Sequence, residues 1–333
     1  MNRKNIPSIL FCCKLLIYFL IFDGLENVCP YENDNFKYSF IEDSIESECI
    51  DYRKHVLKDS AFTRNRIWCF ADYVKHILFN QRKTIQNNID THLKYAKDGV
   101  DSYSKQSFSE QRININPNVF KKISLNYLRN IGYINHQKTN TFFRTFYGFR
   151  LFAGDGSLFE LPNKKLTLKE FGFEEDYDKK INVIFSGVVD VLNDFLIDGL
   201  IGKKGEGEHT LIHKNIENCR RLIIPEESIF IFDRGYTSIE LMVRIIEMHS
   251  HFVIRLRKDT YIGERESMTC DDEIVKIELD KIRRNQFKSN YFKNKMKVVK
   301  ALNLRIVNIE LETGEIETVI TNLPQETMSK DQL

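Results

Sequence analysis

The stretch SIFIFDRGYTS, residues 228–238, constrains the fold more than any other part of the sequence. Four apolar residues run directly into Asp233, and an arginine, a glycine and a tyrosine follow. A short β-branched and aromatic run of this kind is typical of a buried strand. A carboxylate at the end of a buried strand is costly unless it has a partner. The stretch therefore predicts a buried strand in a sheet, with an aspartate at its carboxyl end that needs a partner such as a hydrogen-bond donor or a cation.

The residues around this strand, 149–258, predict an α/β fold. Strands come first and helices and strands then alternate, which indicates a mixed sheet covered by helices. The segment FRLFAGDGSLFELP predicts a strand that reaches Asp155, then a turn at Gly156 and Ser157, then a continuation. The other expected elements are two strands in 181–202 with a turn at 192–194, a helix in 207–223, a helix in 238–250 and a strand in 251–258.

Asp155 and Asp233 share the same setting, because each ends an apolar strand beside a glycine-containing turn. Sites in α/β sheets form beyond the carboxyl ends of strands. Two carboxylates brought together there repel each other unless a cation lies between them, and Mg²⁺ or Mn²⁺ prefers carboxylate oxygens. The pair therefore predicts a metal site. The alternative is that Asp233 caps the helix that follows it.

The segment 55–148 is predicted to be a helical, basic domain. Residues 51–150 hold 18 Lys and Arg against 7 Asp and Glu, although the net charge of the whole chain is only +2. Apolar spacing predicts helices within 61–100, with Thr63 as a cap, and two short helices in 103–131, the first capped near Ser104 or Ser107 and the second started by Pro117. A basic helical segment favours DNA binding, and a solvated helical bundle is the alternative. Expected DNA contacts here are Lys105, Arg112, Lys121 and Lys122.

Residues 259–320 are predicted to form a β-rich, basic segment. Eight Lys and Arg and no acid stand between Lys281 and Lys300. Such a run would bind DNA phosphates without reading sequence. The expected contacts in this run are Arg283, Arg284, Lys288 and Lys293; further ones are Lys203 and Lys204 in a glycine-rich loop, and Arg234 and Tyr236 beside Asp233.

The remaining features indicate a cytoplasmic protein with no membrane association. The seven cysteines form no CxxC pair, which fits free thiols in a reducing compartment. Residues 1–54 are expected to be a leader and an acidic irregular segment. The apolar run 6–22 resembles a short anchor or signal peptide, but Lys14 interrupts it and no small-residue cleavage site follows. His209 and His213 have the spacing of a zinc pair, yet no third ligand stands at a suitable distance, and Glu208 is expected to start a helix.

Four segments occur in the order expected of bacterial insertion-sequence transposases of the DDE superfamily, and the chain most resembles their insertion-sequence-4 group. These segments are AGDGSLFELP, FIFDRGYTSIELM, HFVIRLR and VITNLP. The N-terminal AFTRNR and SKQSFSEQRININPNVF resemble the DNA-binding region of that group. The resemblance covers roughly residues 55–333. It implies an RNase H-like catalytic core in 149–258, interrupted by a β-rich insertion in 259–320, with Asp155 and Asp233 as the first and second catalytic acids.

The resemblance also implies a reaction and its partners. The family hydrolyses double-stranded DNA at transposon ends with Mg²⁺ or Mn²⁺ and then joins the freed 3′-hydroxyl to target DNA; we expect a homodimer in the DNA complex. The third acid is a glutamate in a Tyr-x-x-Arg-x-x-x-Glu helix after TNLP. Residues 321–333 contain the start of a helix near Ser329 but no such glutamate, so the chain is expected to be incomplete and inactive alone. A DNA-binding remnant without catalysis is the main alternative, and a membrane-anchored protein is another.

Overall fold

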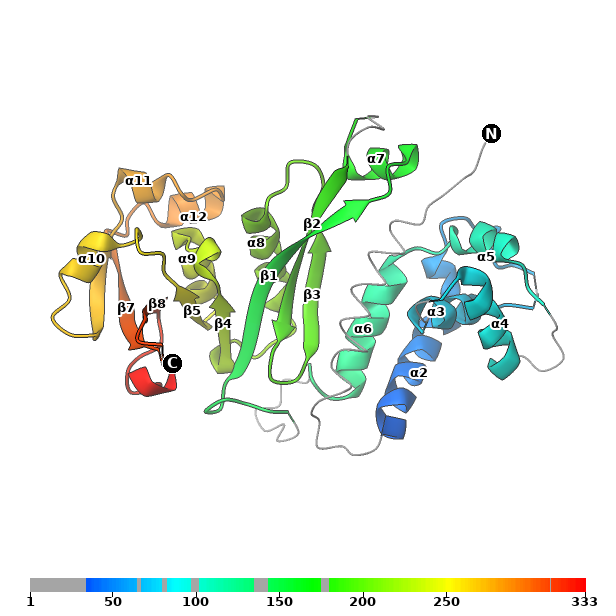
Figure 1. The fold of residues 1–333 in the computed structure, drawn as a ribbon, viewed down its shortest axis with the longest axis horizontal. Helices are drawn as coiled ribbons and strands as arrows, with labels where there is room; N and C mark the ends of the chain where they lie inside the picture. Colours follow the sequence, from blue (N-terminus) through cyan, green and yellow to red (C-terminus); the bar gives the residue numbers. More distant parts are fainter. Residues whose placement is uncertain are drawn as a thin grey trace. The chain divides into compact units, whose positions relative to one another are not determined.

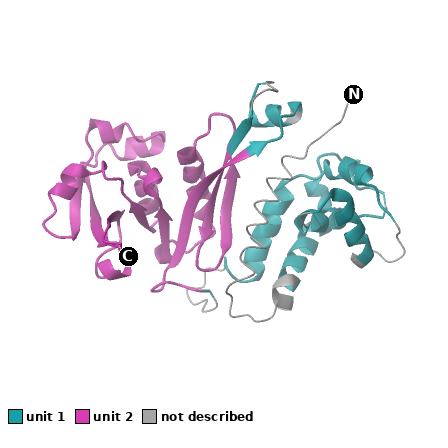
Figure 2. Cartoon of the chain, in the orientation of Figure 1, with its two compact units in different colours: residues 1–143, 160–183 teal, residues 144–159, 184–333 magenta. Residues whose placement is uncertain are grey.

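A computed structural model describes residues 34–64, 67–79, 83–96, 102–134, 143–174, 180–311 and 313–333. The apolar stretch 6–22 lies outside these residues. The chain divides into two compact units, one of residues 1–143 and 160–183 and one of residues 144–159 and 184–333 (Figure 2). We call them the helical unit and the sheet unit. No described helix is both long enough and apolar enough to cross a membrane.

The helical unit begins with a helix that the sequence did not lead us to expect. We predicted an irregular acidic segment, but residues Asp34–Ile50 form helix α2. Ile41, Ile45 and Cys49 recur every four residues, so they lie on one face of α2, and all three are buried. The other elements are η1 (Tyr52–His55), α3 (Phe70–Leu78), α4 (Ile85–Ala96), α5 (Lys105–Arg112), α6 (Asn118–Asn130) and α7 (Lys165–Phe171).

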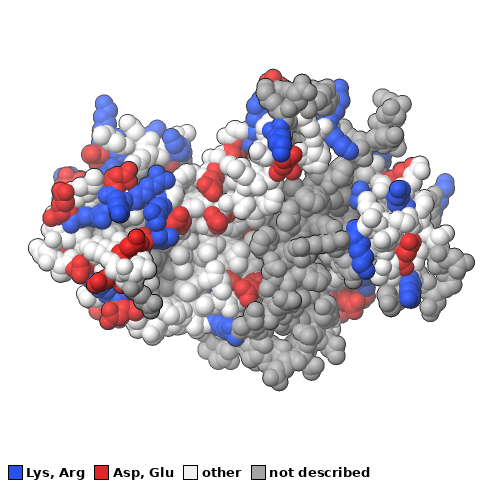
Figure 3. All heavy atoms as spheres, viewed as in Figure 1, with Lys and Arg blue, Asp and Glu red and all other residues white. Residues whose placement is uncertain are grey.

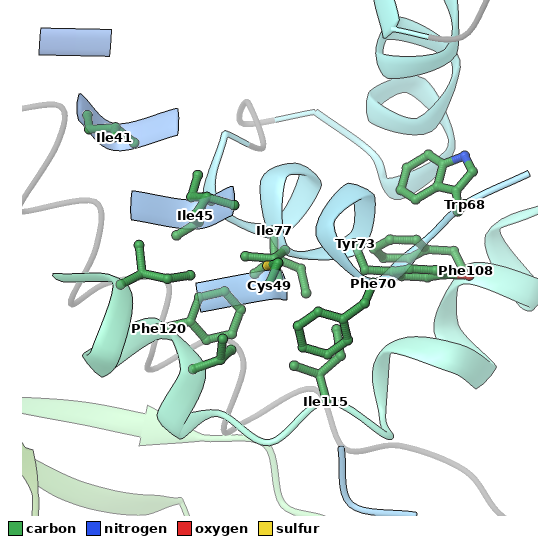
Figure 4. Packing of buried hydrophobic residues seen from close by; sticks show 14 of the residues in the cluster. Ile41, Ile45, Cys49, Trp68, Phe70, Tyr73, Ile77, Phe108, Ile115 and Phe120 are labelled. Atoms are coloured by element: carbon green, nitrogen blue, oxygen red, sulfur yellow. The ribbon is translucent and has the colours of Figure 1, made fainter. Parts of the chain in front are cut away.

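An aromatic cluster forms much of the core of this unit (Figure 4). The ring of Trp68 stacks on Tyr103 with centroids 5.3 Å apart and meets Tyr73 edge-on at the same distance. Phe108, from the first of the two short helices, stacks on Tyr73 at 5.3 Å. Each such ring buries a large apolar area, so the cluster binds the short basic helices to the rest of the unit.

The predicted helix starts agree with the structure except at one position. Ser104 caps α5, where its hydroxyl accepts a hydrogen bond from the Ser107 N–H at 3.2 Å, and Pro117 immediately precedes α6. Thr63 is not a cap, because its hydroxyl donates to the Ser60 carbonyl and the chain does not become helical until Phe70.

The sheet unit is built on an eight-stranded mixed sheet with the order β3-β2-β1-β4-β5-β8-β7-β6 (Figure 1). Strands β1, β4 and β5 are parallel neighbours, and β2 with β3 forms an antiparallel hairpin. This order of the first five strands is consistent with the RNase H-like core that the resemblance implies. The strands are β1 (Arg150–Leu161), β2 (Ile181–Asp190), β3 (Phe195–Ile201), β4 (Ser228–Phe232), β5 (His251–Arg255), β6 (Asp272–Glu278), β7 (Ala301–Glu310) and β8 (Ile316–Thr321).

The two faces of the sheet are covered by different parts of the chain. Helices α8 (Glu208–Cys219) and α9 (Ile239–Glu247) pack against β3 and β5 respectively and touch each other. Leu323 and Met328, after the last strand, pack with Ile229 of β4 in a separate cluster. The residues that follow the last strand therefore complete part of the core.

Arg305 fastens those last residues to the sheet. Its side chain is only 2% exposed, and its Nε lies 2.6 Å from Asp272 Oδ1. Its Nη1 donates to the Met328 carbonyl at 2.6 Å. The carboxylate and the carbonyl offset the desolvation cost of the buried guanidinium charge. Arg305 can therefore hold the C-terminal segment without leaving an unpaired buried charge.

Two predictions for this unit need correction. The turn at Gly156 and Ser157 is absent, because β1 continues through both residues beside its hydrogen-bonded neighbour β2. Residues 281–300 were expected to be β-rich but contain two short helices. The helices of 259–300 are α10 (Ile262–Glu266), α11 (Lys281–Arg284) and α12 (Asn290–Lys295).

The β strands of the insertion do not form a separate sheet. Strand β8 pairs with β5 of the core in an antiparallel manner, and β7 and β6 continue outward from it. Phe287, Phe292 and Met296 of the insertion pack on Ile239 and Val243 of α9. The insertion is therefore bound to the core by main-chain hydrogen bonds and by apolar contacts.

Candidate catalytic carboxylates

The register of β1 and β4 brings the two predicted acids to the same level of the sheet. Ala153 pairs with Ile231 in a parallel ladder, so two residues further along Asp155 stands level with Asp233. Strand β4 ends at Phe232, whereas β1 continues to Leu161. Asp155 and Asp233 therefore lie at the place where β4 leaves the sheet, which we call the β4 end.

Asp233 does not act as a helix cap. It precedes the short 3₁₀ turn η3 (Arg234–Tyr236), but its side chain accepts no capping hydrogen bond. The carboxylate instead lies 3.3 Å from the Nη1 of Arg255 and 3.8 Å from the Nε of Arg234. It is more than half exposed, so it can be reached from solvent.

Glu317 joins this group through the same arginine. The Nη2 of Arg255 lies 2.6 Å from Glu317 Oε2, and Glu317 stands on β8, next to β5 in the sheet. The Arg255 guanidinium holds the pKa of Glu317 below its usual range. Glu317 is therefore connected to Asp233 through Arg255.

Glu208 is a further carboxylate near Asp155. It starts α8, and a Cβ added to Gly156 would come within 2.8 Å of its Cγ and Cδ. Such a distance is closer than van der Waals contact, so the absence of a side chain at Gly156 makes room for Glu208 beside β1. The glycine after Asp155 is the local signal for this close approach, but it does not show which side chain fills the space.

Tyr236 lies near the carboxylates of Glu208, Asp155 and Asp233, and it is only 3% exposed. Its hydroxyl makes no well-formed hydrogen bond with the described groups, although the Glu208 carboxylate lies close enough to act on it. Burial and the nearby Glu208 carboxylate raise the pKa of Tyr236, and the charges of Asp155 and Asp233 act in the same direction. The ring packs near Phe232 and His209, and the expected DNA contact of Tyr236 stays a prediction.

The donor chemistry at the β4 end fits a hard divalent cation. Among the described residues no three His, Cys, Asp or Glu side chains gather closely enough to hold a metal ion. Mg²⁺ commonly uses only one or two carboxylates and completes its coordination with water and substrate phosphates. Asp155 and Asp233 therefore suit an ion that binds together with DNA. No described His, Cys, Asp or Glu joins His209 and His213 to make a group of three possible metal ligands.

The predicted DNA-binding residues fall into two groups. Arg112 lies over the Phe108 ring, Arg283 pairs with Glu264 at 2.7 Å, and Arg284 donates to the Val299 carbonyl at 2.7 Å. These three guanidinium groups are engaged inside their own units. The exposed ones are Lys105, Lys121, Lys122, Lys203, Lys204, Arg234, Lys288 and Lys293. In Figure 3, Lys and Arg atoms gather on the part of the sheet unit where Figure 1 draws α9–α12.

Comparison with known families gives a match to the β-sheet part of the chain. The family described as "Transposase DDE domain" matches residues 150–333, which is more than half of the chain and contains both Asp155 and Asp233. A comparison with curated proteins finds no match. The matched segment starts at the first residue of β1 and covers all eight strands. The chain therefore belongs to the transposase DDE domain family.

Proposed function

We propose that this protein is a transposase of the insertion-sequence-4 group that cuts the ends of its own element and joins them to target DNA. Its substrates are the terminal repeats of the element and a double-stranded target, and we propose that it acts in the cytoplasm as a homodimer on DNA. The observation that carries the proposal is the register of β1 and β4, since it aligns two carboxylates at the open end of a parallel pair within a matching family.

Asp155 and Asp233 are the proposed metal-holding catalytic residues. When bound there, Mg²⁺ or Mn²⁺ would activate water or a 3′-hydroxyl and neutralise charge on the phosphate. The two aspartates would hold the ion at the β4 end. Arg234 and Arg255 supply positive charge beside Asp233, which reduces repulsion between the two carboxylates before an ion binds.

We propose that residues 1–333 by themselves have little or no cleavage activity. The third acid that the family pattern calls for, a glutamate in a Tyr-x-x-Arg-x-x-x-Glu helix, is not among residues 322–333. The helical part of those residues is the short 3₁₀ turn η4 (Lys330–Gln332), where the Ser329 N–H donates to the Gln332 side chain at 2.8 Å. Loss of a metal-binding carboxylate removes several kcal/mol of transition-state stabilisation.

Two measurements on the same preparation test these proposals. Calorimetric titration with Mn²⁺ should show binding that Asp155→Asn and Asp233→Asn each weaken strongly, while Asp198→Asn in β3 serves as an aspartate control outside the β4 end. Incubation of supercoiled plasmid with Mg²⁺ or Mn²⁺ should give little nicking. Absence of Mn²⁺ binding would contradict the metal assignment, and nicking that Asp155→Asn abolishes would contradict the proposed inactivity.

A further inference from the structure

Arg255 connects two carboxylates at the β4 end. It is the last residue of β5, the strand next to β4, and so it emerges at the same edge of the sheet as Asp233. Its Nη2 lies 2.6 Å from Glu317 Oε2 and its Nη1 lies 3.3 Å from Asp233 Oδ1. The two contacts are unequal, because the bond to Glu317 is much the shorter.

The solvent exposure of Asp233, Arg255 and Glu317 shows which of the two contacts of Arg255 is more easily replaced by another ligand. Glu317 is 20% exposed, whereas Asp233 is 58% exposed and Arg255 is 42% exposed. Exposed ion pairs contribute little free energy, so the Asp233 contact is readily given up. The hydrogen bond to Glu317 is the main reason that the pKa of Arg255 is raised. Glu317 therefore anchors one edge of the guanidinium while the other edge faces the candidate metal site.

A cation bound by Asp233 would compete with Arg255 for the same carboxylate. Arginine presents several N–H donors in a fixed planar fork, and this fork matches the oxygens of a phosphate group as well as those of a carboxylate. Once a metal ion neutralises Asp233, the Nη1 edge is left without its acceptor at a place where DNA phosphate must approach.

We propose that Arg255 is a phosphate-binding residue of this site, which exchanges Asp233 for a DNA phosphate when a divalent cation binds, and that Glu317 is the positioning residue that keeps its guanidinium in place. This inference rests on the proposed function, because it takes DNA as the substrate and Asp233 as a metal ligand. Arg255 would then contact DNA only when the metal ion is bound. An ordinary surface cation would contact DNA with or without the metal ion.

The test compares Arg255→Ala with Arg257→Ala, which removes the same charge from an exposed residue two positions further along the chain. Mn²⁺ affinity is measured by calorimetry. DNA affinity is measured by fluorescence anisotropy of a labelled mixed-sequence duplex over a range of KCl concentrations, with and without Mn²⁺. Circular dichroism checks that each variant is folded, and Arg255→Gln, which can still donate to Glu317, provides a second variant.

The expected result is a pair of opposite changes. Arg255→Ala should raise Mn²⁺ affinity roughly three- to tenfold, because a competing cation is removed from Asp233. With Mn²⁺ present it should lower DNA affinity and reduce the slope of log K against log salt by about one phosphate contact. Without Mn²⁺ the slope should not change. Glu317→Gln should weaken Mn²⁺ binding, because Arg255 is then free to pair fully with Asp233.

The outcomes separate this inference from the proposed function. If Arg255→Ala and Arg257→Ala alter Mn²⁺ affinity and the salt slope equally, or if the slope falls equally with and without Mn²⁺, the inference is overturned while the metal site stands. If the unaltered protein binds no Mn²⁺, the proposed function itself fails, and the inference fails with it.

Discussion

Glu240 is a buried carboxylate through which α9 holds the insertion, and its removal should destabilise the sheet unit. Its side chain is 1% exposed and lies 2.7 Å from the Nη2 of Arg244. It also accepts hydrogen bonds from the backbone N–H groups of Lys288 and Ser289, just before α12. Glu240→Ala would therefore leave two amides and a guanidinium without their acceptor.

The magnitude follows from these contacts. Breaking a buried ion pair by removing one partner costs about 3–5 kcal/mol, and a hydrogen bond to a charged group contributes about 1.5–3 kcal/mol. These values cannot simply be added, because Arg244 is 18% exposed and can regain water after the substitution. We expect Glu240→Ala to lower the free energy of unfolding of the sheet unit by about 3–5 kcal/mol.

Glu247 provides a matched control on the same helix. It also contacts the insertion, through Lys295 and the Tyr291 hydroxyl, but its side chain is 21% exposed. Because partly exposed ion pairs are weak, Glu247→Ala should cost less than about 1 kcal/mol. Urea denaturation gives the loss of stability, and hydrogen exchange at the amides of Lys288 and Ser289 locates it. Equal losses for the two variants, or unchanged protection of those amides in Glu240→Ala, would refute the reasoning.

Three further predictions concern the neighbourhood of the site. Tyr236→Phe should change the free energy of unfolding by less than about 1 kcal/mol, because the buried hydroxyl makes no well-formed hydrogen bond with the described groups; thermal denaturation measures this. Gly156→Ala should cost about 1–3 kcal/mol because its Cβ meets Glu208, and a Gly156→Ala, Glu208→Ala double variant should recover most of that loss in the same assay. Burial and Arg244 lower the pKa of His213 from 6.5 to about 4 in the folded protein, so protons favour the unfolded state. Stability should fall as the pH drops from 6.5 towards 4, and urea midpoints measured for His213→Gln should lack that part of the pH dependence.

The strands and the two aspartates could be predicted because their signals are local. A buried strand is a short apolar run, and an acid that ends it is visible in the same few residues, as at Asp233. The hairpin of β2 and β3, the start of α5 at Ser104 and the start of α6 after Pro117 also follow from local patterns. The turn predicted at Gly156 was wrong because pairing with a neighbouring strand outweighs the preference of glycine for turns.

The contacts that complete the site could not be predicted, because they join residues far apart in sequence. Arg255 and Glu317 are 62 positions apart and meet only because β8 returns to pair with β5. Glu208 reaches Gly156 across 52 positions by the packing of α8 on the sheet. Charge composition also could not show that the guanidinium groups of Arg283 and Arg284 form contacts inside the sheet unit.

The antiparallel pairing of β5 with β8 has a consequence for how such a protein can change over time. Strand β5 ends at Arg255, and the adjacent strand β8 begins at Ile316. The sixty residues between them are therefore an insertion whose two ends lie close together at neighbouring strands. A hairpin of a few residues could span that gap. The insertion can therefore become longer or shorter, or be replaced, without a change in the order of the strands that carry Asp155 and Asp233. Its surface can evolve independently of the two proposed catalytic carboxylates.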